Sequence, residues 1–366
     1  MTVPTEHQGS RTSWHCVHVH FHEPDVDRLI LDAVRPLFQQ VRSRVDGLHL
    51  ARHWLRGPHL RLFARTDPDT WARVVRPRVD TVVGGYLAAH PSTAVPDLEH
   101  ELAQHRFLAR RERERGPLTP WFPDNSIHEQ PYDARPHVIR SPEVGELMAE
   151  FASAGTQPLF RMLEQVRAGA DAKELIALEL MLATTAAARP PVAAGFASYR
   201  SHAEAFLRSC RDPEAVRAAF DAHYESRREA FTARTRAVLA TLGGGVDRTP
   251  YARRWAALCR EHGRRARPLV ERGLVFPPPV EPPAAPVHAL PLGDRAHREA
   301  LRRDPGFLTY RFLLNCAHLQ VGRLGLTPFQ RFRTCHAAAN AVEEVLGVRA
   351  VDAVRAHVEA RPDPTP

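Results

Sequence analysis

Residues 48–65, LHLARHWLRGPHLRLFAR, constrain the fold most, because two stretches of alternating apolar and polar residues flank an Arg-Gly-Pro sequence. Alternation with a period of two is typical of β-strands, and Gly-Pro between two such stretches predicts a β-hairpin. With a three-residue loop, His53 would pair with Arg61 and His49 with Arg65. Side chains alternate across a strand, so this hairpin must have two unlike faces.

One predicted face of the hairpin is apolar and the other is cationic. The apolar face should pack on a core, and apart from the interruption at Arg52 it comprises Leu48, Leu50, Trp54, Leu60 and Leu62. The opposite face is rich in imidazole and guanidinium groups and comprises His49, His53, His59, Phe63, Arg61 and Arg65. Such groups suit carbonyl oxygens or an anionic peptide. The pattern alone leaves open an ordinary solvent-facing sheet surface.

A second alternating stretch, WHCVHVHFH at residues 14–22, predicts another strand. Its side chains divide into an apolar and a polar set, Val17, Val19 and Phe21 against Cys16, His18, His20 and His22. Three histidines at two-residue spacing could bind a metal, but no acidic or cysteine partner accompanies them at a metal-site spacing. We therefore expect no metal site. A sheet face that lines a pocket explains the pattern as well.

Two amphipathic helices are expected beside these strands. Asp25 or Asp27 begins the first helix, which Pro36 should kink. The second helix follows the hairpin and is capped at Thr66 or Asp67. The order strand, helix, strand, strand, helix resembles a split β-α-β unit. Both helices can then cover one sheet face and leave the face with the His and Arg residues for a ligand.

Residues 88–140 lack clear periodicity. A charge-dense stretch at 105–116 predicts a solvated helix, and the Pro and Asn residues after it predict a long ordered loop or short strands. Long loops inside a compact chain are commonly functional or mobile. The side chains in this loop that could reach a substrate are Trp121, His128, Tyr132 and Arg135.

The remainder of the chain is expected to be helical. Helix starts are indicated at Ser141-Pro142 and at Thr327-Pro328, and one long helix is expected from about 214 to 242. Residues 276–291 read as a Pro-rich spacer. We predict an α+β fold, with an N-terminal split β-α-β-like sheet carrying helices on one face and a mainly helical second half. A β-rich, ferredoxin-like part at 1–140 and a helical part at 141–366 should together form one compact, elaborated domain.

Composition narrows the classes of function. The net charge of +8 is compatible with an acidic leader peptide or RNA as partner, but no RNP or helix-turn-helix signature points to nucleic acid. No apolar run approaches the ~20 residues of a membrane span, and no signal peptide is apparent, which favours a cytoplasmic protein. The five cysteines show no C-x-x-C spacing, which argues against a zinc knuckle or a disulfide framework. Without a G-x-G-x-x-G sequence or a P-loop, we expect no cofactor.

Three segments resemble one family, the C-terminal domain of lantibiotic dehydratases and its stand-alone relatives from thiopeptide biosynthesis. The first is GPHLRLF preceded by His53-Trp54, the second is SYRSHAEAF at 198–206, and the third is NCAHLQVGRLGL at 315–326. The third looks like the family's H-x-x-x-N-R-L-G pattern. The order and spacing of the segments carry the resemblance, which runs from about Trp14 to Gly347.

The resemblance implies one of two reactions on a ribosomally made precursor peptide. Eliminating enzymes remove glutamate from glutamylated Ser or Thr and leave dehydroamino acids. Pyridine synthases join two dehydroalanines of a leader-bearing, azole-containing peptide in a formal aza-Diels–Alder cyclisation, then release water and leader to give a pyridine-centred macrocycle. A third possibility is a non-catalytic scaffold that binds the leader peptide for other maturation enzymes.

Departures from the family pattern favour the pyridine synthase. Eliminating relatives usually read P-H-x-R-x-R, in which both arginines hold the glutamyl carboxylate; here Arg61 matches the first and Phe63 stands in place of the second. A site without that second guanidinium binds a carboxylate poorly. The Glu-Arg-Tyr-Gly-Gly segment of eliminating relatives is also missing. Against this, Gly322 replaces the Asn that precedes Arg323 in the third motif.

The resemblance also implies roles for single residues. His318 matches the catalytic histidine of eliminating relatives and is the expected proton-transfer group, although the residues alone favour helix packing for it. Arg61 would polarise or anchor a carbonyl. Further acids or positioning groups are expected to be Tyr199, His202 and Tyr310, and the expected substrate-binding residues are His53, His59, Phe63, Ser201, Tyr132 and Arg323. We expect Arg61 and His318 to face one pocket.

Overall fold

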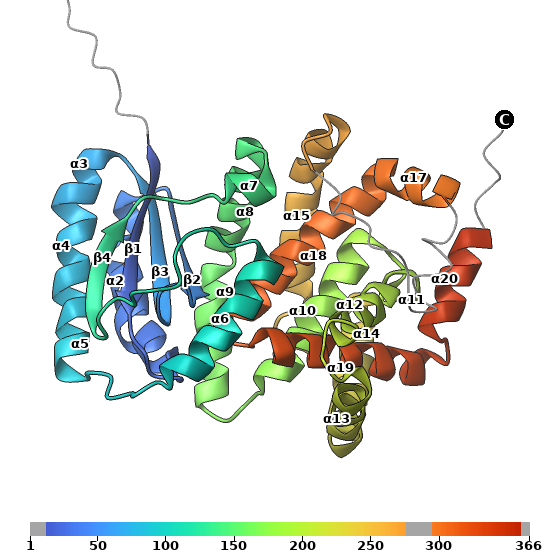
Figure 1. Cartoon of the computed structure of the whole chain (residues 1–366). Helices are drawn as coiled ribbons and strands as arrows, with labels where there is room; N and C mark the ends of the chain where they lie inside the picture. The colour runs from blue at the N-terminus through green and yellow to red at the C-terminus, as the bar shows by residue number, and fades with distance from the viewer. Residues whose placement is uncertain (1–11, 276–294, 360–366) are drawn as a thin grey trace, which may run out of the picture. The chain divides into compact units, whose positions relative to one another are not determined.

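The computed structural model describes residues 12–275 and 295–359 (Figure 1). Contacts divide the chain into two compact units. The first contains residues 1–138 and 152–164, and the second contains residues 139–151 and 165–366. The first unit holds the β-sheet and the second is helical, which confirms the predicted α+β class. Residues 152–164 belong to the first unit although residues 139–151 belong to the second. The hydrophobic periodicity of the sequence does not predict this division.

The described part of the first unit contains a four-stranded sheet with the order β2-β3-β1-β4. Its strands pair antiparallel throughout and are β1 (Ser13–His20), β2 (Gly47–His53), β3 (His59–Thr66) and β4 (Ser126–Gln130). A helical run follows β1 and another follows β3, so the unit has the split β-α-β arrangement. The strand β4 lies within the stretch where the sequence indicated a loop or short strands.

Both helical runs contain wide π-helical turns. The first consists of α1 (Asp27–Leu29), η1 (Ile30–Val34), α2 (Arg35–Val41) and the 3₁₀ turn η2 (Arg42–Arg44). The second consists of α3 (Pro68–Thr70), η3 (Trp71–Val75), α4 (Arg76–Arg78), η4 (Val79–Gly84) and α5 (Gly85–Ala89). Pro36 and Pro77 each follow a π turn, which makes room for a ring that would clash with the preceding turn of an α-helix. Asp67 caps the second run by accepting from the Thr70 amide at 2.9 Å, as predicted.

The two helical runs cover one face of the sheet (Figure 1). The interior between them is lined by apolar side chains, among them Val17, Leu62, Leu37, Phe38, Val75 and Val79. The predicted apolar hairpin face is confirmed for Leu48, Leu50, Leu60 and Leu62, which are buried. Arg52, which interrupts this face, pairs with Asp27 of the first helical run. Burial of these side chains provides the main stabilisation of the unit.

The hairpin register differs from the predicted one by two residues. His53 pairs with His59, Ala51 with Arg61 and His49 with Phe63, so the loop spans residues 54–58. Arg56 and Gly57 both adopt left-handed backbone conformations, with φ of 61° and 102°, which the three-residue loop did not anticipate. A shift of two residues keeps every side chain on its predicted face, whereas a shift of one would reverse them.

Trp54 is a correction to the predicted apolar face. Because β2 ends at His53, Trp54 no longer follows the alternation of the strand. Its indole stacks on the His53 ring, with centroids 5.5 Å apart, and donates to Glu112 at 3.1 Å. Trp54 therefore belongs with the polar side of the sheet.

The remaining helices include three between residues 98 and 167, α6 (Leu98–Glu112), α7 (Pro136–Ile139) and α9 (Thr156–Arg167). The described helices of the second unit are α8 (Pro142–Ala154), α10 (Lys173–Ala188), α11 (Val192–Gly195), α12 (Ala197–Leu207), α13 (Pro213–Ser226), α14 (Arg228–Leu242), α15 (Ala252–Glu271), α17 (Arg295–Arg303), α18 (Pro305–Arg323), α19 (Pro328–Leu346) and α20 (Ala350–Glu359). The helix α10 is buried along most of its length and contacts α14, α15, α18 and α19. It forms the centre of this unit.

Helix boundaries in the second unit follow the sequence signals with one exception. The Thr327 hydroxyl and the Gln330 side chain form a capping box at α19, and Ser141 accepts from the Val144 amide at α8. The single helix predicted from about 214 to 242 is wrong, because Arg227 leaves the helical conformation and separates α13 from α14. The Arg227 guanidinium bonds to the buried Glu174 at 2.6 Å, a tertiary contact that local sequence does not encode. The predicted Pro-rich spacer at 276–291 lies outside the described residues.

Within the described ranges no single helix has both the length and the apolar character needed to cross a membrane. The helices at residues 173–188 and 192–207 have that length and apolar character only when they are taken together, and the chain bends by 100° between them.

Candidate functional site

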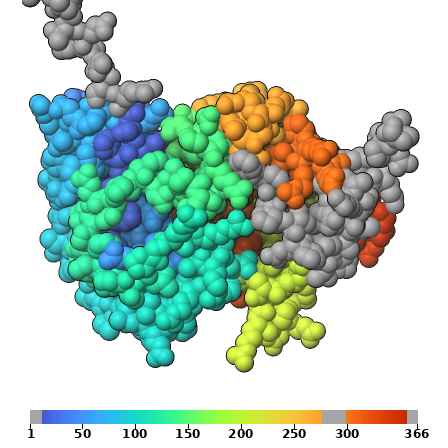
Figure 2. Space-filling model, turned by 45° about the horizontal axis from the view of Figure 1, so that its top comes forward, coloured from blue at the N-terminus to red at the C-terminus, as the bar shows by residue number. Residues whose placement is uncertain are grey.

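The sheet surface opposite the helical runs, which we call the polar face, carries imidazoles from all four strands. Strand pairing aligns His18 with Arg61 and with His128, and aligns His20 with His59. The side chains of the polar face include His18, His20, His53, His59, Arg61, Phe63 and His128. In the space-filling view, blue atoms of this unit's strands are visible in a recess bordered by the teal and green atoms of residues 98–138 (Figure 2). The polar face is thus partly covered and partly open.

Arg61 is held by two histidines on the polar face. Its Nε donates to His59 Nε2 at 3.3 Å, and one of its terminal nitrogens lies 3.1 Å from His53 Nδ1. Because His59 Nε2 accepts, His59 carries its proton on Nδ1, which lies 2.8 Å from the carbonyl oxygen of Gly57. The guanidinium is therefore fixed in direction before any ligand arrives.

Four histidines of the polar face, His18, His20, His53 and His59, are neutral at pH 7. Burial lowers the pKa of His18 and of His20 to about 3, and Arg61 and neighbouring histidines add to the effect. Burial likewise lowers the pKa of His53 to about 4. The pKa of His59 is held well below its usual range for the same reason. Arg61 is thus the cation of this cluster, surrounded by uncharged rings.

Aromatic rings and a carboxylate from the segment after α6 complete the polar face. The Phe122 ring contacts both His20 and His128 in tilted arrangements, with ring centroids 4.6 Å from each. Glu114 is buried and lies 3.5 Å from His53 Nε2 and 3.0 Å from the Arg135 guanidinium. Sequence reasoning missed Glu114, because it looks like one more charge in a solvated helix. Only the tertiary structure brings the Glu114 carboxylate near His53, Arg135 and Arg61.

Phe63 is packed rather than open. Its ring stacks on His49 with centroids 4.3 Å apart and meets the Tyr132 ring edge-on at 5.8 Å. Tyr132 in turn stacks on Trp14. Phe63 and Tyr132 therefore form an aromatic wall at one end of the polar face, with Arg61 two residues along the same strand.

The second unit contains a pair of histidines from two of the recognised motifs. His202 on α12 and His318 on α18 place Nδ1 and Nε2 2.8 Å apart. Burial, His202 and Arg331 hold the pKa of His318 well below its usual range. The other ring nitrogen of His318, Nδ1, is enclosed and has no hydrogen-bond partner among the described residues. A neutral imidazole that shares a proton with a second one can accept or deliver that proton at neutral pH.

Tyr199 and Tyr310 are packed in the core of the same unit. Each is 1% exposed, and their hydroxyls share the Thr185 hydroxyl at 2.9 and 3.1 Å. The Tyr199 hydroxyl also donates to the Met181 carbonyl, and the Tyr310 hydroxyl to the Gly195 carbonyl. Their predicted catalytic role stays a prediction, but satisfied hydrogen bonds and full burial favour a role in packing.

Arg323 and Ser201, the other predicted residues of this unit, differ in burial. Arg323 is buried and donates to Gln320 at 2.7 Å, and burial lowers its pKa to about 9. Ser201 is partly buried on α12. Neither arrangement tests their predicted part in substrate binding.

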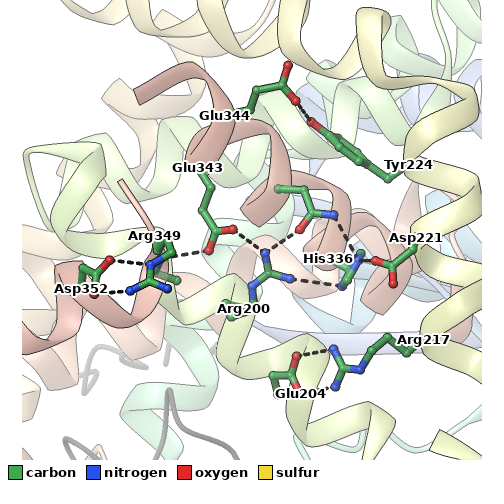
Figure 3. A network of polar contacts seen from close by, with 12 residues as sticks. Arg200, Glu204, Arg217, Asp221, Tyr224, His336, Glu343, Glu344, Arg349 and Asp352 are labelled. Atoms are coloured by element: carbon green, nitrogen blue, oxygen red, sulfur yellow. Dashed lines mark hydrogen bonds and ion pairs between the residues drawn. The ribbon is translucent and has the colours of Figure 1, made fainter. Parts of the chain in front are cut away.

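A polar network anchors the motif helix α12 (Figure 3). Arg200 donates to Asn340 and to Glu343 on α19 and lies 3.3 Å from His336 Nδ1. The other ring nitrogen of His336 lies 2.7 Å from Asp221 on α13. Sequence reasoning passed over Arg200, although it stands inside the SYRSHAEAF motif. Its position between Tyr199 and Ser201 of the motif was the signal that could have found it.

His202, His318 and Cys335 bring their ligand atoms within 4.8 Å of one another, a spacing that admits a metal ion. Two nitrogens bound to tetrahedral zinc, each at 2.0–2.1 Å, lie about 3.3 Å apart. The 2.8 Å separation of the two histidine nitrogens is that of a hydrogen bond. Arg331 adds positive charge near His318. The geometry fits a proton-sharing pair better than a metal centre, and the expectation of no metal stays a prediction.

The predicted site residues thus form two groups. Arg61 lies with four other predicted residues in the first unit, His53, His59, Phe63 and Tyr132. His318 lies with the remaining ones in the second unit, Tyr199, Ser201, His202, Tyr310 and Arg323. The contacts given above bring Arg61, His53 and His59 together, and they bring His202 and His318 together. The expectation of a single pocket stays a prediction.

Comparison with known proteins identifies the class. The family described as the C-terminal part of the lantibiotic biosynthesis dehydratases matches residues 14–342, and the chain belongs to this family. The pyridine synthase TbtD from thiomuracin biosynthesis has a similar structure, with a TM-score of 0.75 and 37% sequence identity over 91% of this chain and 99% of that chain. The crystal structure of TsrL, 19% identical, shares the fold with a TM-score of 0.72 over 96% of this chain and 100% of that one. No curated protein matches the chain significantly.

Proposed function

We propose that this chain is a thiopeptide pyridine synthase, which joins two dehydroalanines of a ribosomally made peptide and releases the leader to give a pyridine-centred macrocycle. The observation that carries the proposal is the similarity to TbtD, which extends over nearly the full length of both chains. The family resemblance seen in the sequence and the family match support the same class of peptide-processing enzyme.

The arrangement around Phe63 supports cyclisation over glutamate elimination. Elimination calls for a carboxylate clamp, and Arg61 is the guanidinium that the family pattern supplies here. The position two residues further on is filled by Phe63, which is packed against His49 and Tyr132 and leaves no room for a second guanidinium. An aromatic wall beside one cation suits a flat, azole-bearing peptide with polarised carbonyls.

The proposed reaction requires proton transfer to and from an amide and precise positioning of the two dehydroalanines. Formation of the azadiene requires an amide to become its iminol, with a proton donor near the carbonyl oxygen and an acceptor near the N–H. Arg61 is suited to hold a carbonyl, and the hydrogen-bonded His202–His318 pair is suited to move a proton. Folding the peptide so that two dehydroalanines stack is an entropic task, to which fixed side chains contribute.

The proposed substrate is a precursor with a leader and a dehydrated, azole-bearing core, processed in the cytoplasm, where such precursors are made. The net charge of +8 favours an acidic leader, because opposite charges speed association. Other maturation enzymes are possible partners in the same sequence of modifications.

One experiment separates the three candidate functions. The protein is incubated with a synthetic bis-dehydroalanine peptide and, separately, with a glutamylated peptide, and the products are analysed by mass spectrometry. A pyridine macrocycle with free leader amide supports the proposal. Release of glutamate from the second peptide would identify an eliminating enzyme, and tight leader binding without turnover of either peptide would identify a scaffold.

A further inference from the structure

We propose that Glu114 is a positioning residue, which fixes the tautomer of His53 and through it the direction of the Arg61 guanidinium. The kinetic consequence of this inference rests on the proposed function, but the tautomer itself does not. No motif of the sequence marks Glu114, which lies two residues past Glu112, the last residue of α6.

Glu114 is a buried carboxylate in a basic environment. Its side chain is 5% exposed, and its Oε1 lies 3.0 Å from Arg135 and 3.5 Å from His53 Nε2. Burial alone would raise its pKa, but His53, Arg135 and Arg61 hold the pKa below the ordinary value. Glu114 is therefore an anion that faces one imidazole nitrogen and one guanidinium.

The opposite side of His53 receives two donors. The backbone N–H of Leu55 donates to His53 Nδ1 at 3.1 Å, and Arg61 approaches the same nitrogen at 3.1 Å. A nitrogen that accepts cannot carry a proton in neutral imidazole, so the proton of His53 resides on Nε2. The Glu114 carboxylate lies 3.5 Å from this nitrogen, so an anion stands beside the ring nitrogen that carries the proton.

The opposite tautomer is incompatible with these contacts. A proton on Nδ1 would confront the Leu55 N–H and the Arg61 guanidinium, so three donors would meet without an acceptor. Arg61 would lose the contact to His53 and keep only the one to His59. Glu114 favours the Nε2–H tautomer because it places an anion beside that N–H, and in this tautomer the Arg61 guanidinium keeps both of its histidine contacts.

Arg135 is held beside Glu114 by two contacts. Its guanidinium pairs with Glu114 and also donates to the carbonyl oxygen of Glu112, which fixes the segment where Glu114 lies. Without the carboxylate, Arg135 and Arg61 would be two like charges near one neutral ring. The Glu114 carboxylate offsets both positive charges.

The tautomer is tested in the protein without substrate. Nitrogen-15 NMR of labelled histidine reports which ring nitrogen of His53 carries the proton, with a His53→Gln variant to assign the signal. We expect the Nε2–H form in the native protein and in Glu114→Gln, whose amide oxygen still accepts. Glu114→Ala should give the Nδ1–H form or a mixture. An unchanged Nε2–H signal in Glu114→Ala would overturn the inference.

Turnover of the bis-dehydroalanine peptide gives the second readout. We expect kcat/KM to fall about 10- to 100-fold in Glu114→Ala and to recover to within about threefold of native in Glu114→Gln, as for other residues that orient a functional group through a histidine. Glu99→Gln, an exposed residue at the start of α6, is the matched control and should retain native turnover.

The outcomes distinguish the inference from the proposed function. If the native protein forms no macrocycle, the proposed function fails while the NMR result still decides the role of Glu114. If native turnover is observed and both Glu114 variants lose it equally, the charge rather than the tautomer matters, and the inference is wrong. Glu114→Leu, which keeps the side-chain volume, replaces Glu114→Ala if the latter does not fold.

Discussion

His202 and His318, separated by 116 residues in the chain, place one ring nitrogen each 2.8 Å apart. One of the two must donate and the other accept, so a single proton occupies the hydrogen bond between the two rings. The helices that carry them, α12 and α18, hold two of the recognised motifs. This relationship gives His318 a partner that the third motif alone does not contain.

The first prediction concerns pH. Burial and nearby positive charge lower the pKa of His318 below its ordinary value of 6.5, so the neutral, proton-accepting form persists into more acidic solution. The acid limb of kcat/KM against pH should therefore lie below pH 6.5, and His318→Asn should reduce turnover at least about 100-fold. An acid limb at or above pH 6.5 in the native enzyme, or full activity in His318→Asn, would remove His318 from the reaction.

The second prediction concerns the shape of the Arg61 side chain. Lys at this position keeps the charge but lacks the fork that reaches His59 and His53 together. We expect Arg61→Lys to lower kcat/KM by about 10- to 100-fold, equivalent to about 1.5–3 kcal/mol for a charged hydrogen bond. Arg65→Lys, on the same strand and face, is the control and should be close to native. Equal effects of both changes would indicate that only charge matters.

The third prediction concerns acid stability of the first unit. The pKa of His20 is about 3 in the folded protein and about 6.5 in the unfolded chain. Between these pH values the imidazole binds a proton in the unfolded chain but not in the folded protein. Stability contributed by neutral His20 is present above pH 6.5 and is lost as the pH falls towards 3. His20 is fully buried and neither ring nitrogen has a hydrogen-bond partner among the described residues.

His20→Phe should make the unfolding midpoint less dependent on pH between 6.5 and 4, because a phenyl ring takes up no proton. The measurement is urea unfolding at several pH values, with His90→Phe, an exposed position, as the control. A pH dependence that His20→Phe leaves unchanged would show that other groups control acid unfolding.

The fourth prediction concerns the network around α12 (Figure 3). Arg200→Ala leaves Glu343 without the guanidinium that lies 2.9 Å away and removes the partner of His336 Nδ1. Loss of a largely buried partner should cost about 3 kcal/mol of unfolding free energy. Arg349→Ala, which breaks an exposed pair with Asp352 in the same region, should change the melting temperature little. Calorimetry of both variants checks the difference, and equal effects would contradict the assigned role of Arg200.

Prediction from sequence succeeded where the signal is local. Within the two strands, the alternation at residues 48–65 assigned the buried and polar faces of the hairpin correctly, because side-chain direction depends only on the parity of position. Trp54, which lies beyond the end of β2, was assigned to the wrong face. The capping residues Asp67 and Thr327 marked their helix starts, because a cap acts within three residues. The loop length of the hairpin was wrong, because the left-handed conformation of Arg56 is unusual for a residue with a side chain.

The sequence by itself determined which residues could take part in chemistry, since motif spacing and face alternation are properties of the chain alone. Only the tertiary structure decided how they act. It packed Tyr199 and Tyr310 into a core, gave His318 the partner His202, and brought Glu114 against His53. These contacts join residues many positions apart, and desolvation and proton sharing depend on such neighbours rather than on neighbours along the chain.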